Sequence, residues 1–217
     1  MKIITLLIIL LLSPLVPIQF AKLLVTHANV IQIIAPDFKM TGTGFHVKAP
    51  SGAVYILTNR HVCAGAVDGE LLISTGVDIQ YRKVVAIAPV GDLCLVEPIQ
   101  KNGIEVAEDH SLITPILQIG HGGGNSASSQ IAFMRSKRII PMCTRRPPVT
   151  IQEALGGGKV QCVLNQVYAY DFLAKGGASG SPIMSLDGEL VSVLFAINDT
   201  QTYGVPLNQI QKFLQGF

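Results

Sequence analysis

The sequence predicts an all-β protein, and three observations support that fold class. Hydrophobic residues make up 49% of the 217 residues and charged residues only 14%, a composition that excludes intrinsic disorder and supports a sizeable core. Short runs rich in Val, Ile and Thr alternate with clusters of Gly, Pro, Asp and Asn, as in strands joined by turns. No long helical periodicity interrupts these runs, which disfavours a parallel sheet with crossover helices. Many short strands at this spacing are typical of barrels or a sandwich.

The predicted strands fall into two sets, which a polar connector at 101–111 separates. The first set comprises 25–34, 44–48, 54–58, 71–74, 81–87 and 93–97. The second set comprises 116–119, 131–133, 139–143, 160–170, 183–185, 190–196 and 203–205. Only the C-terminal end has a helical pattern, because four apolar residues there share one helical face: Leu207, Ile210, Phe213 and Leu214.

The N-terminus has the pattern of an export signal or a membrane anchor. Lys2 precedes a run at 3–12 that is apolar except for one threonine, and serine and proline then break the run. Ten apolar residues suit the core of a signal peptide better than a spanning helix, which needs about 20. Gln19 stands where cleavage before Lys22 prefers a small residue, so residues 1–21 are expected to be a signal peptide or a retained anchor. Both predict an exported location (periplasmic, secreted or membrane-anchored), and the alternative is an apolar strand or helix of the fold itself.

Four cysteines, at 63, 94, 143 and 162, permit two disulfides in an exported chain. Cys143 and Cys162 flank a stretch rich in Pro and Gly and could close a hairpin. Cys94 stands between two leucines in an apolar run, which predicts a small residue of the core. The spacing is not C-x-x-C and no histidine pattern accompanies it, so neither a metal site nor a cofactor is expected.

Three segments carry the residue types that acyl transfer needs. His61 ends the strand pattern at 56–63, Asp92 begins the apolar strand at 91–96, and Ser179 lies inside the glycine turn at 176–182. Acyl transfer requires a nucleophile, a base that takes its proton and an acid that orients the base. The glycines allow a sharp turn whose amide N–H groups can point at a developing oxyanion.

At these residues the chain resembles the chymotrypsin-fold serine proteases, and more narrowly the trypsin-like proteases of the HtrA/Deg type and their viral relatives. Residues 41–45 resemble the family's glycine-containing first strand, 57–62 its base motif, 92–96 its acid motif and 177–182 its nucleophile motif. Residues 187–191 and 203–206 resemble its closing strands. The resemblance covers about residues 30–217. It implies two six-stranded antiparallel β-barrels with a short C-terminal helix: an N-terminal barrel at 22–112 and a C-terminal barrel at 113–217. No PDZ domain is expected after that helix.

The resemblance also implies a role for each site residue in cleaving a polypeptide substrate. The Ser179 hydroxyl attacks the scissile carbonyl, His61 takes its proton and passes it to the leaving amine, and Asp92 orients the imidazole. The backbone N–H groups of Gly177 and Ser179 form the oxyanion hole. The chain order His, Asp, Ser agrees, because α/β-hydrolases run Ser, acid, His and subtilisins run Asp, His, Ser.

Two residues depart from the family pattern. Ser181 replaces the second glycine after the nucleophile, and its small size is expected to fit the turn. Ala178 stands where digestive-type enzymes carry an aspartate that pairs with a newly cut N-terminus. Alanine cannot form that ion pair, so activation by N-terminal clipping is not expected.

The predicted substrate pocket comprises residues just before the nucleophile and on the strand after it: Leu173, Ala174, Val193 and Phe195. None of them is charged, which favours aliphatic or small apolar substrate side chains. Asp171 keeps a preference for basic side chains open as the alternative.

Two further interpretations come from other classes of function. A catalytically inactive protease fold could serve as a binding or scaffold module, although all three residue types of a triad are present. An acyl hydrolase of another fold is disfavoured by the chain order. Nucleic acid is not an expected partner, because the formal net charge is only +2 and the basic cluster at 135–146 lacks interleaved aromatic residues.

Overall fold

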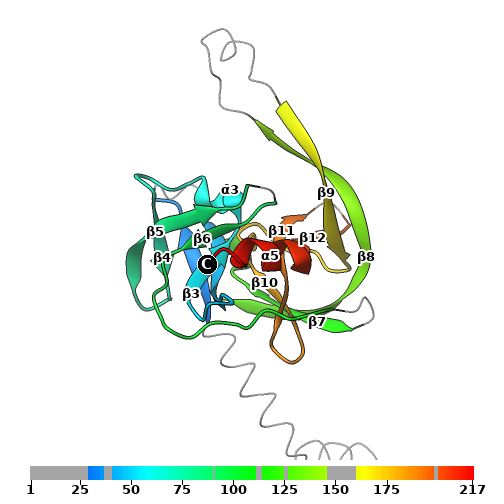
Figure 1. Cartoon of the computed structure of the whole chain (residues 1–217), viewed down its shortest axis with the longest axis horizontal. Coiled ribbons are helices and arrows are strands. Elements are labelled where there is room, and N and C mark those ends of the chain that lie inside the picture. Colours follow the sequence, from blue (N-terminus) through cyan, green and yellow to red (C-terminus); the bar gives the residue numbers. More distant parts are fainter. Residues whose placement is uncertain are drawn as a thin grey trace, which may run out of the picture.

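The computed structural model describes residues 29–36, 41–89, 91–110, 114–124, 127–145, 160–197 and 200–217, with the side chains of all except 140–145 and 160–165. The predicted leader at 1–21 lies outside the described residues. Two closed six-stranded antiparallel barrels form the described part, which confirms the predicted fold class (Figure 1).

The first barrel contains β1 (Val30–Ile34), β2 (Thr41–Lys48), β3 (Val54–Thr58), β4 (Glu70–Ser74), β5 (Ile79–Ile87) and β6 (Cys94–Val96). Its strand order is β1-β2-β3-β6-β5-β4, and pairing of β1 with β4 closes it. Strand β6 therefore lies directly beside β3, with Thr58 opposite Cys94. This pairing brings together the two predicted motifs that contain His61 and Asp92.

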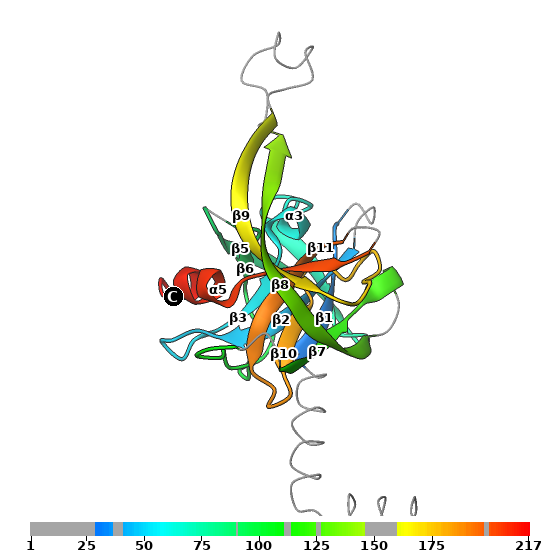
Figure 2. The ribbon, with the colours of Figure 1, turned by 90° about the vertical axis from the view of Figure 1, so that its right-hand side faces the viewer.

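The second barrel contains β7 (Pro115–Gly120), β8 (Ser128–Arg145), β9 (Val160–Tyr170), β10 (Pro182–Ser185), β11 (Leu190–Ile197) and β12 (Thr202–Val205). Its strand order is β10-β11-β12-β9-β8-β7. The strands predicted at 131–133 and 139–143 are one strand, β8, with an irregularity opposite β9 between Met134 and Ser136. The intervening charged residues are compatible with a strand because Arg135, Lys137 and Arg138 are exposed. The paired strands β8 and β9 continue beyond the barrel as a long hairpin (Figure 2).

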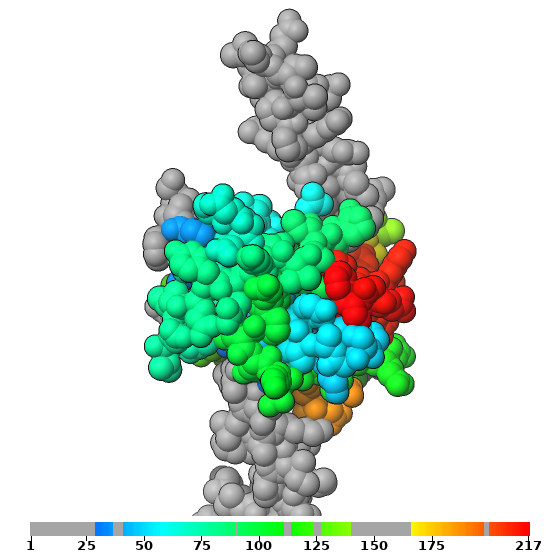
Figure 3. Space-filling model, turned by 60° about the vertical axis from the view of Figure 1, so that its left-hand side comes forward, coloured from blue at the N-terminus to red at the C-terminus, as the bar shows by residue number. Residues whose placement is uncertain are grey.

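Two α-helices occur among the described residues. The predicted strand at 54–58 is confirmed as β3. Helix α3 (Arg60–Cys63) follows it directly, so His61 lies on a short helix and not at the end of a strand. Helix α5 (Leu207–Leu214) confirms the predicted C-terminal helix. On the molecular surface it lies next to the turn between β2 and β3 (Figure 3). No helix in the described ranges is long and apolar enough to cross a membrane.

One hydrophobic cluster spans the two barrels, beside a separate cluster within each barrel. Leu57 and Leu95 of the first barrel belong to the same buried cluster as Met184 and Val193 of the second. The connector also joins the barrels through bridges, Ile104 to Val47 of β2 and Val106 to Leu190 of β11. Such burial fixes the barrels against each other, so residues from both can form one site.

Candidate active site

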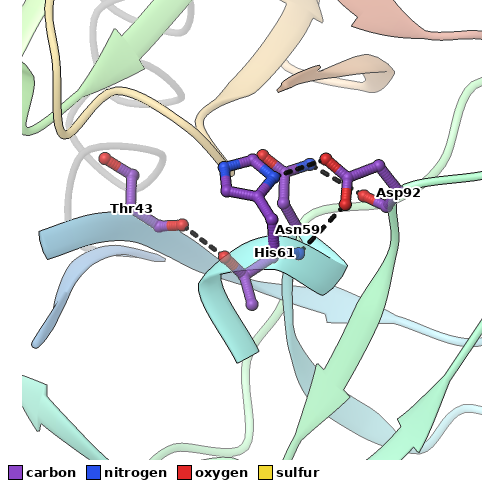
Figure 4. A network of polar contacts seen from close by, with 5 residues as sticks. Thr43, Asn59, His61 and Asp92 are labelled. Carbon is purple, nitrogen blue, oxygen red and sulfur yellow. Dashed lines mark hydrogen bonds and ion pairs between the residues drawn. The ribbon is translucent and has the colours of Figure 1, made fainter. Parts of the chain in front are cut away.

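The base and acid motifs meet because neighbouring strands of the first barrel deliver them. His61 lies on α3, directly after β3, and Asp92 lies just before β6. His61 Nδ1 is 2.6 Å from Asp92 Oδ2, and the His61 backbone N–H donates to Asp92 Oδ1 at 3.0 Å (Figure 4). One carboxylate thus contacts both the ring and the main chain of the histidine, which fixes the position of the imidazole.

Asn59 holds the backbone of the acid, and the sequence analysis assigns it no role of its own. Its Nδ2 donates to the backbone carbonyl of Asp92 at 2.8 Å, and Asn59 is fully buried (Figure 4). The side chain of Asp92 is 8% exposed, whereas that of His61 is 47% exposed. The acid is therefore shielded from water and the base is open to it. The only signal in the sequence was the position of Asn59 two residues before His61.

A disulfide joins the same two elements. Cys63 follows His61 by two residues, Cys94 follows Asp92 by two residues, and the two cysteines are bonded to each other. The prediction of Cys94 as a small core residue is confirmed, since it is fully buried in the core of the first barrel, and it is also half of this disulfide. Spacing alone could not reveal the pair, because the β3–β6 pairing creates it. Cys143 and Cys162 are opposite each other in the β8–β9 register, but their side chains lie outside the described residues.

The nucleophile turn depends on glycine at two positions. Gly177 and Gly180 have φ angles of 89° and 87°, in the left-handed region that favours glycine. A Cβ on Gly180 would also collide with the Thr43 carbonyl oxygen and the Thr58 hydroxyl. The glycine pattern therefore serves both the sharp turn and its close approach to the first barrel.

The backbone amides of this turn divide into two groups. The N–H of Ala178 donates to Lys175 O at 3.0 Å, that of Gly180 to Leu194 O at 2.8 Å, and that of Ser181 to Ala178 O at 3.0 Å. Within the described part of the chain, the N–H groups of Gly177 and Ser179 donate to no protein acceptor. The two amides that the sequence assigns to the oxyanion hole are thus left unpaired by the protein.

The predicted base and nucleophile line the same cavity. His61, Gly177 and Ser179 border a space of about 320 Å³, which residues of β1, β2 and α3 complete. Among the described residues, no hydrogen bond joins the His61 imidazole to the Ser179 hydroxyl. Catalytic hydrogen bonds are often long in ligand-free enzymes and shorten when substrate binds. The arrangement places a base and a hydroxyl at one opening between the barrels.

The four residues of the predicted substrate pocket do not lie together. Leu173 and Ala174 line a separate cavity of about 330 Å³. Val193 is fully buried and Phe195 is 8% exposed, and both belong to the core between the barrels. Their side chains face the core because alternate residues of β11 point inward, so the structure does not place them in this cavity.

Polar residues complete the cavity beside Leu173. Gln118 of β7, Gln130 of β8 and Lys175 line it, and Gln130 Nε2 donates to Gln118 Oε1 at 3.0 Å. The predicted uncharged, apolar pocket therefore does not describe this space. Sequence reasoning missed the two glutamines because β7 and β8 are far from the nucleophile in the chain.

The two departures from the family pattern are both accommodated. Ala178 is 3% exposed and packs in the apolar core of the second barrel. Ser181 is fully buried, and its hydroxyl fits sterically because Gly120 lies opposite, where any Cβ would collide with Ser181 Oγ. Within the described residues this hydroxyl has no hydrogen-bond partner. The described residues contain no cluster of His, Cys, Asp or Glu that could hold a metal ion.

Comparison with known proteins agrees with this geometry. Residues 42–193 match the family described as a trypsin-like peptidase domain. The Rv3671c protease of M. tuberculosis, in its inactive form, superposes with a TM-score of 0.69 at 20% identity, covering 90% of this chain and 91% of that one. No curated protein matches the sequence.

Two further solved structures have the same fold. The HtrA-type protease AlgW, solved with a tripeptide, gives a TM-score of 0.65 at 16% identity and covers 88% of this chain and 60% of its own. The serine protease of a human pathogenic astrovirus gives 0.57 at 14% identity, covering 83% and 90%. At these identities the likeness is one of fold.

Proposed function

The chain belongs to the trypsin-like peptidase family, and on that premise we propose that it is a serine endopeptidase with Ser179, His61 and Asp92 as its catalytic triad. One observation carries this proposal. His61 is held by Asp92 at 2.6 Å and borders the same cavity as Ser179 and the unpaired amide of Gly177. Nucleophile, base, acid and oxyanion donors are therefore available around one opening.

The contacts of Asp92 determine how His61 acts. A carboxylate only accepts hydrogen bonds, so Asp92 Oδ2 selects the imidazole tautomer that carries its proton on Nδ1. Nε2 is then the free acceptor, which takes the proton of Ser179 as the hydroxyl attacks the scissile carbonyl. The imidazolium that forms is stabilised by Asp92 and passes its proton to the leaving amine. His61 then takes a proton from a water that attacks the acyl-enzyme carbonyl, and it returns this proton to Ser179 Oγ as the carboxylic acid product leaves.

The oxyanion that forms during attack needs hydrogen-bond donors that are already in place. The N–H groups of Gly177 and Ser179 fit this role, because neither donates to a protein acceptor in the described residues. Each such donor is typically worth about 3 kcal/mol of transition-state stabilisation. Since the donors belong to the backbone, their position depends entirely on the conformation of the turn.

We also propose that the chain acts in an exported or membrane-tethered location. The pattern at 1–21 supports this, and so does the buried Cys63–Cys94 disulfide, because disulfides persist in oxidising compartments. Protease treatment of intact cells or spheroplasts that produce the chain tests the location. Digestion of the catalytic part without lysis is the expected result.

Labelling with a fluorophosphonate probe tests the peptidase function. The wild-type protein is expected to react at Ser179, and the Ser179→Ala and His61→Ala variants are expected to lose labelling. Ser51→Ala is a matched control, because Ser51 is an exposed serine in the turn between β2 and β3. Cleavage of a peptide library, with Ser179→Ala as the blank, then gives the substrate preference.

The absence of a hydrogen bond between His61 and Ser179 favours one second candidate, an inactive fold that binds polypeptides. A folded wild-type protein that the probe does not label, and that cleaves no peptide of the library, would support this scaffold in place of the enzyme.

A further inference from the structure

Thr43 connects the first barrel to the nucleophile turn of the second. It lies in β2 and is fully buried. Its backbone N–H donates to Ser179 O at 2.7 Å, and its hydroxyl donates to Gly177 O at 2.9 Å. The same hydroxyl accepts the backbone N–H of His121 at 3.0 Å. One threonine therefore holds both ends of the turn that carries the proposed oxyanion donors.

Thr43 is itself held firmly in the first barrel. Its carbonyl accepts the Thr58 hydroxyl at 2.7 Å (Figure 4), and it is opposite Gln32 in the pairing of β1 with β2. All its polar groups, including both functions of the hydroxyl, are thus engaged. A side chain fixed in this way can position its partners precisely in space, because it has no other low-energy arrangement.

The contacts act on the peptide groups that contain the oxyanion donors. The peptide between Gly177 and Ala178 is held at both ends, because its carbonyl accepts from Thr43 Oγ1 and its N–H donates to Lys175 O. The adjoining peptides carry the N–H groups of Gly177 and Ser179. The Ser179 carbonyl is fixed by Thr43 N–H. Rotation of the central peptide would change the orientation of both adjoining peptides and therefore of both unpaired amides.

We propose that Thr43 is a positioning residue of the oxyanion hole, which acts through the carbonyls of Gly177 and Ser179. This inference rests on the proposed peptidase function. It assigns to the hydroxyl a role that the glycines of the turn cannot provide by themselves, since glycine permits several conformations and selects none. The orientation of the donors in the second barrel is thus determined from the first.

Two substitutions separate the hydroxyl from the bulk of the side chain. Thr43→Val keeps the shape and the backbone N–H but removes the hydroxyl, which leaves Gly177 O without its donor. Thr43→Ser keeps the hydroxyl and removes only a methyl group. We expect Thr43→Val to lower kcat by about 10-fold to 100-fold with KM within about twofold, because the lost interaction serves the transition state. Thr43→Ser is expected to stay within about threefold of wild type.

A peptide aldehyde provides a second readout, because its adduct with Ser179 places an oxyanion in the hole. Its affinity should fall in Thr43→Val in parallel with kcat, and it should recover in Thr43→Ser. Equal kcat and equal aldehyde affinity in Thr43→Val and wild type would overturn the proposal. Equal losses in both variants would also overturn it, because packing of the methyl group would then explain the effect.

Amide hydrogen exchange in the Ser179→Ala protein tests the positioning without any activity. The N–H of Ala178, which donates a hydrogen bond to Lys175 O, should exchange faster when Thr43→Val is added. Its exchange rate should not change when Thr43→Ser is added. Unchanged exchange in Thr43→Val contradicts the positioning role. If wild type resists the fluorophosphonate and yet this exchange pattern is found, the peptidase function fails while the hold of Thr43 on the turn stands.

Discussion

The two halves of the proposed site are held by different means. The base and acid lie within one barrel, where His61 and Asp92 share two direct hydrogen bonds and a disulfide joins the elements that carry them. The nucleophile turn belongs to the other barrel and reaches the first through hydrogen bonds to Thr43. The geometry of the first half is thus local to one barrel, whereas that of the second depends on how the barrels pack.

The halves also differ in how their polar groups are satisfied. The Asp92 side chain is 8% exposed, so its charge acts on His61 with little screening. The nucleophile turn instead leaves two backbone donors unpaired. The first half therefore provides a fixed electrostatic environment, and the second provides donors that become satisfied only when a reacting group is present.

The largest expected effect tests the first half. Asp92→Asn keeps the shape of the side chain, but its amide can donate toward His61 Nδ1 and thereby favour the wrong imidazole tautomer. We expect kcat to fall by about 10⁴-fold. Steady-state cleavage of a peptide substrate measures it, and Asp109→Asn, at an exposed acid in the connector, is the control. A loss of less than about tenfold would mean that Asp92 does not orient the base.

The second prediction tests the contact between the barrels. Gly180→Ala adds a Cβ at a φ of 87°, and that atom collides with the Thr43 carbonyl. Strain of about 1–3 kcal/mol and overpacking of a similar size should combine to lower the free energy of unfolding. Denaturant unfolding measures the loss, and labelling at Ser179 should fall with it.

Gly76→Ala is the matched control for that substitution. Gly76 has a φ of 85°, but nothing lies within 4 Å of its Cβ position. It should therefore lose only the strain contribution and keep full labelling at Ser179. Equal losses in the two variants would show that the approach of Gly180 to Thr43 does not matter for stability.

The third prediction concerns the covalent tie of the first half. Replacing both cysteines, Cys63→Ala with Cys94→Ala, should lower the free energy of unfolding by about 2–4 kcal/mol, because the disulfide closes a loop across a separation of 31 residues. Denaturant unfolding of the oxidised wild type, the reduced wild type and the double variant measures the effect. Reductant should destabilise the wild type and leave the variant unchanged. A variant as stable as the oxidised wild type would contradict the expectation.

The same comparison explains how much the sequence could predict. The barrels and the three motifs were accessible, because strand patterns, turn residues and chain order are local features. Asn59, Thr43 and the cysteine pair act through neighbours that are 33, 134 and 31 positions away. Those contacts exist only after the strands have paired and the barrels have packed, so no local sequence pattern predicts them.

The errors have a related physical cause. The strand pattern was taken to extend to His61 because the four residues of α3 are too few to show helical periodicity. Strand β8 was divided because charged residues, which face solvent, separate its two apolar runs. Val193 was assigned to the pocket because it lies on the strand that follows the nucleophile. In the pleat of β11, however, its side chain points into the core.

The smallest expected effect comes from a buried histidine in the first barrel. Desolvation lowers the pKa of His46 below its ordinary value of 6.5. Its Nδ1 lies 3.2 Å from Asn29 O and its Nε2 accepts the Ile99 N–H at 3.3 Å, which together require the neutral ring. Between the folded pKa and 6.5, the unfolded chain binds a proton at this site that the folded protein does not. Stability should therefore fall as the pH drops below 6.5.

Thermal unfolding between pH 8 and pH 5 measures that dependence, and two variants assign it. Burial also lowers the pKa of His110, so each of the two histidines should account for part of the loss of stability toward low pH. His46→Gln is expected to be less stable at every pH, because it perturbs a fully buried position, but with a smaller decline toward low pH. His110→Gln should remove the part of the decline that His110 causes. An unchanged slope in both variants would show that the acid sensitivity of the protein arises from groups other than His46 and His110.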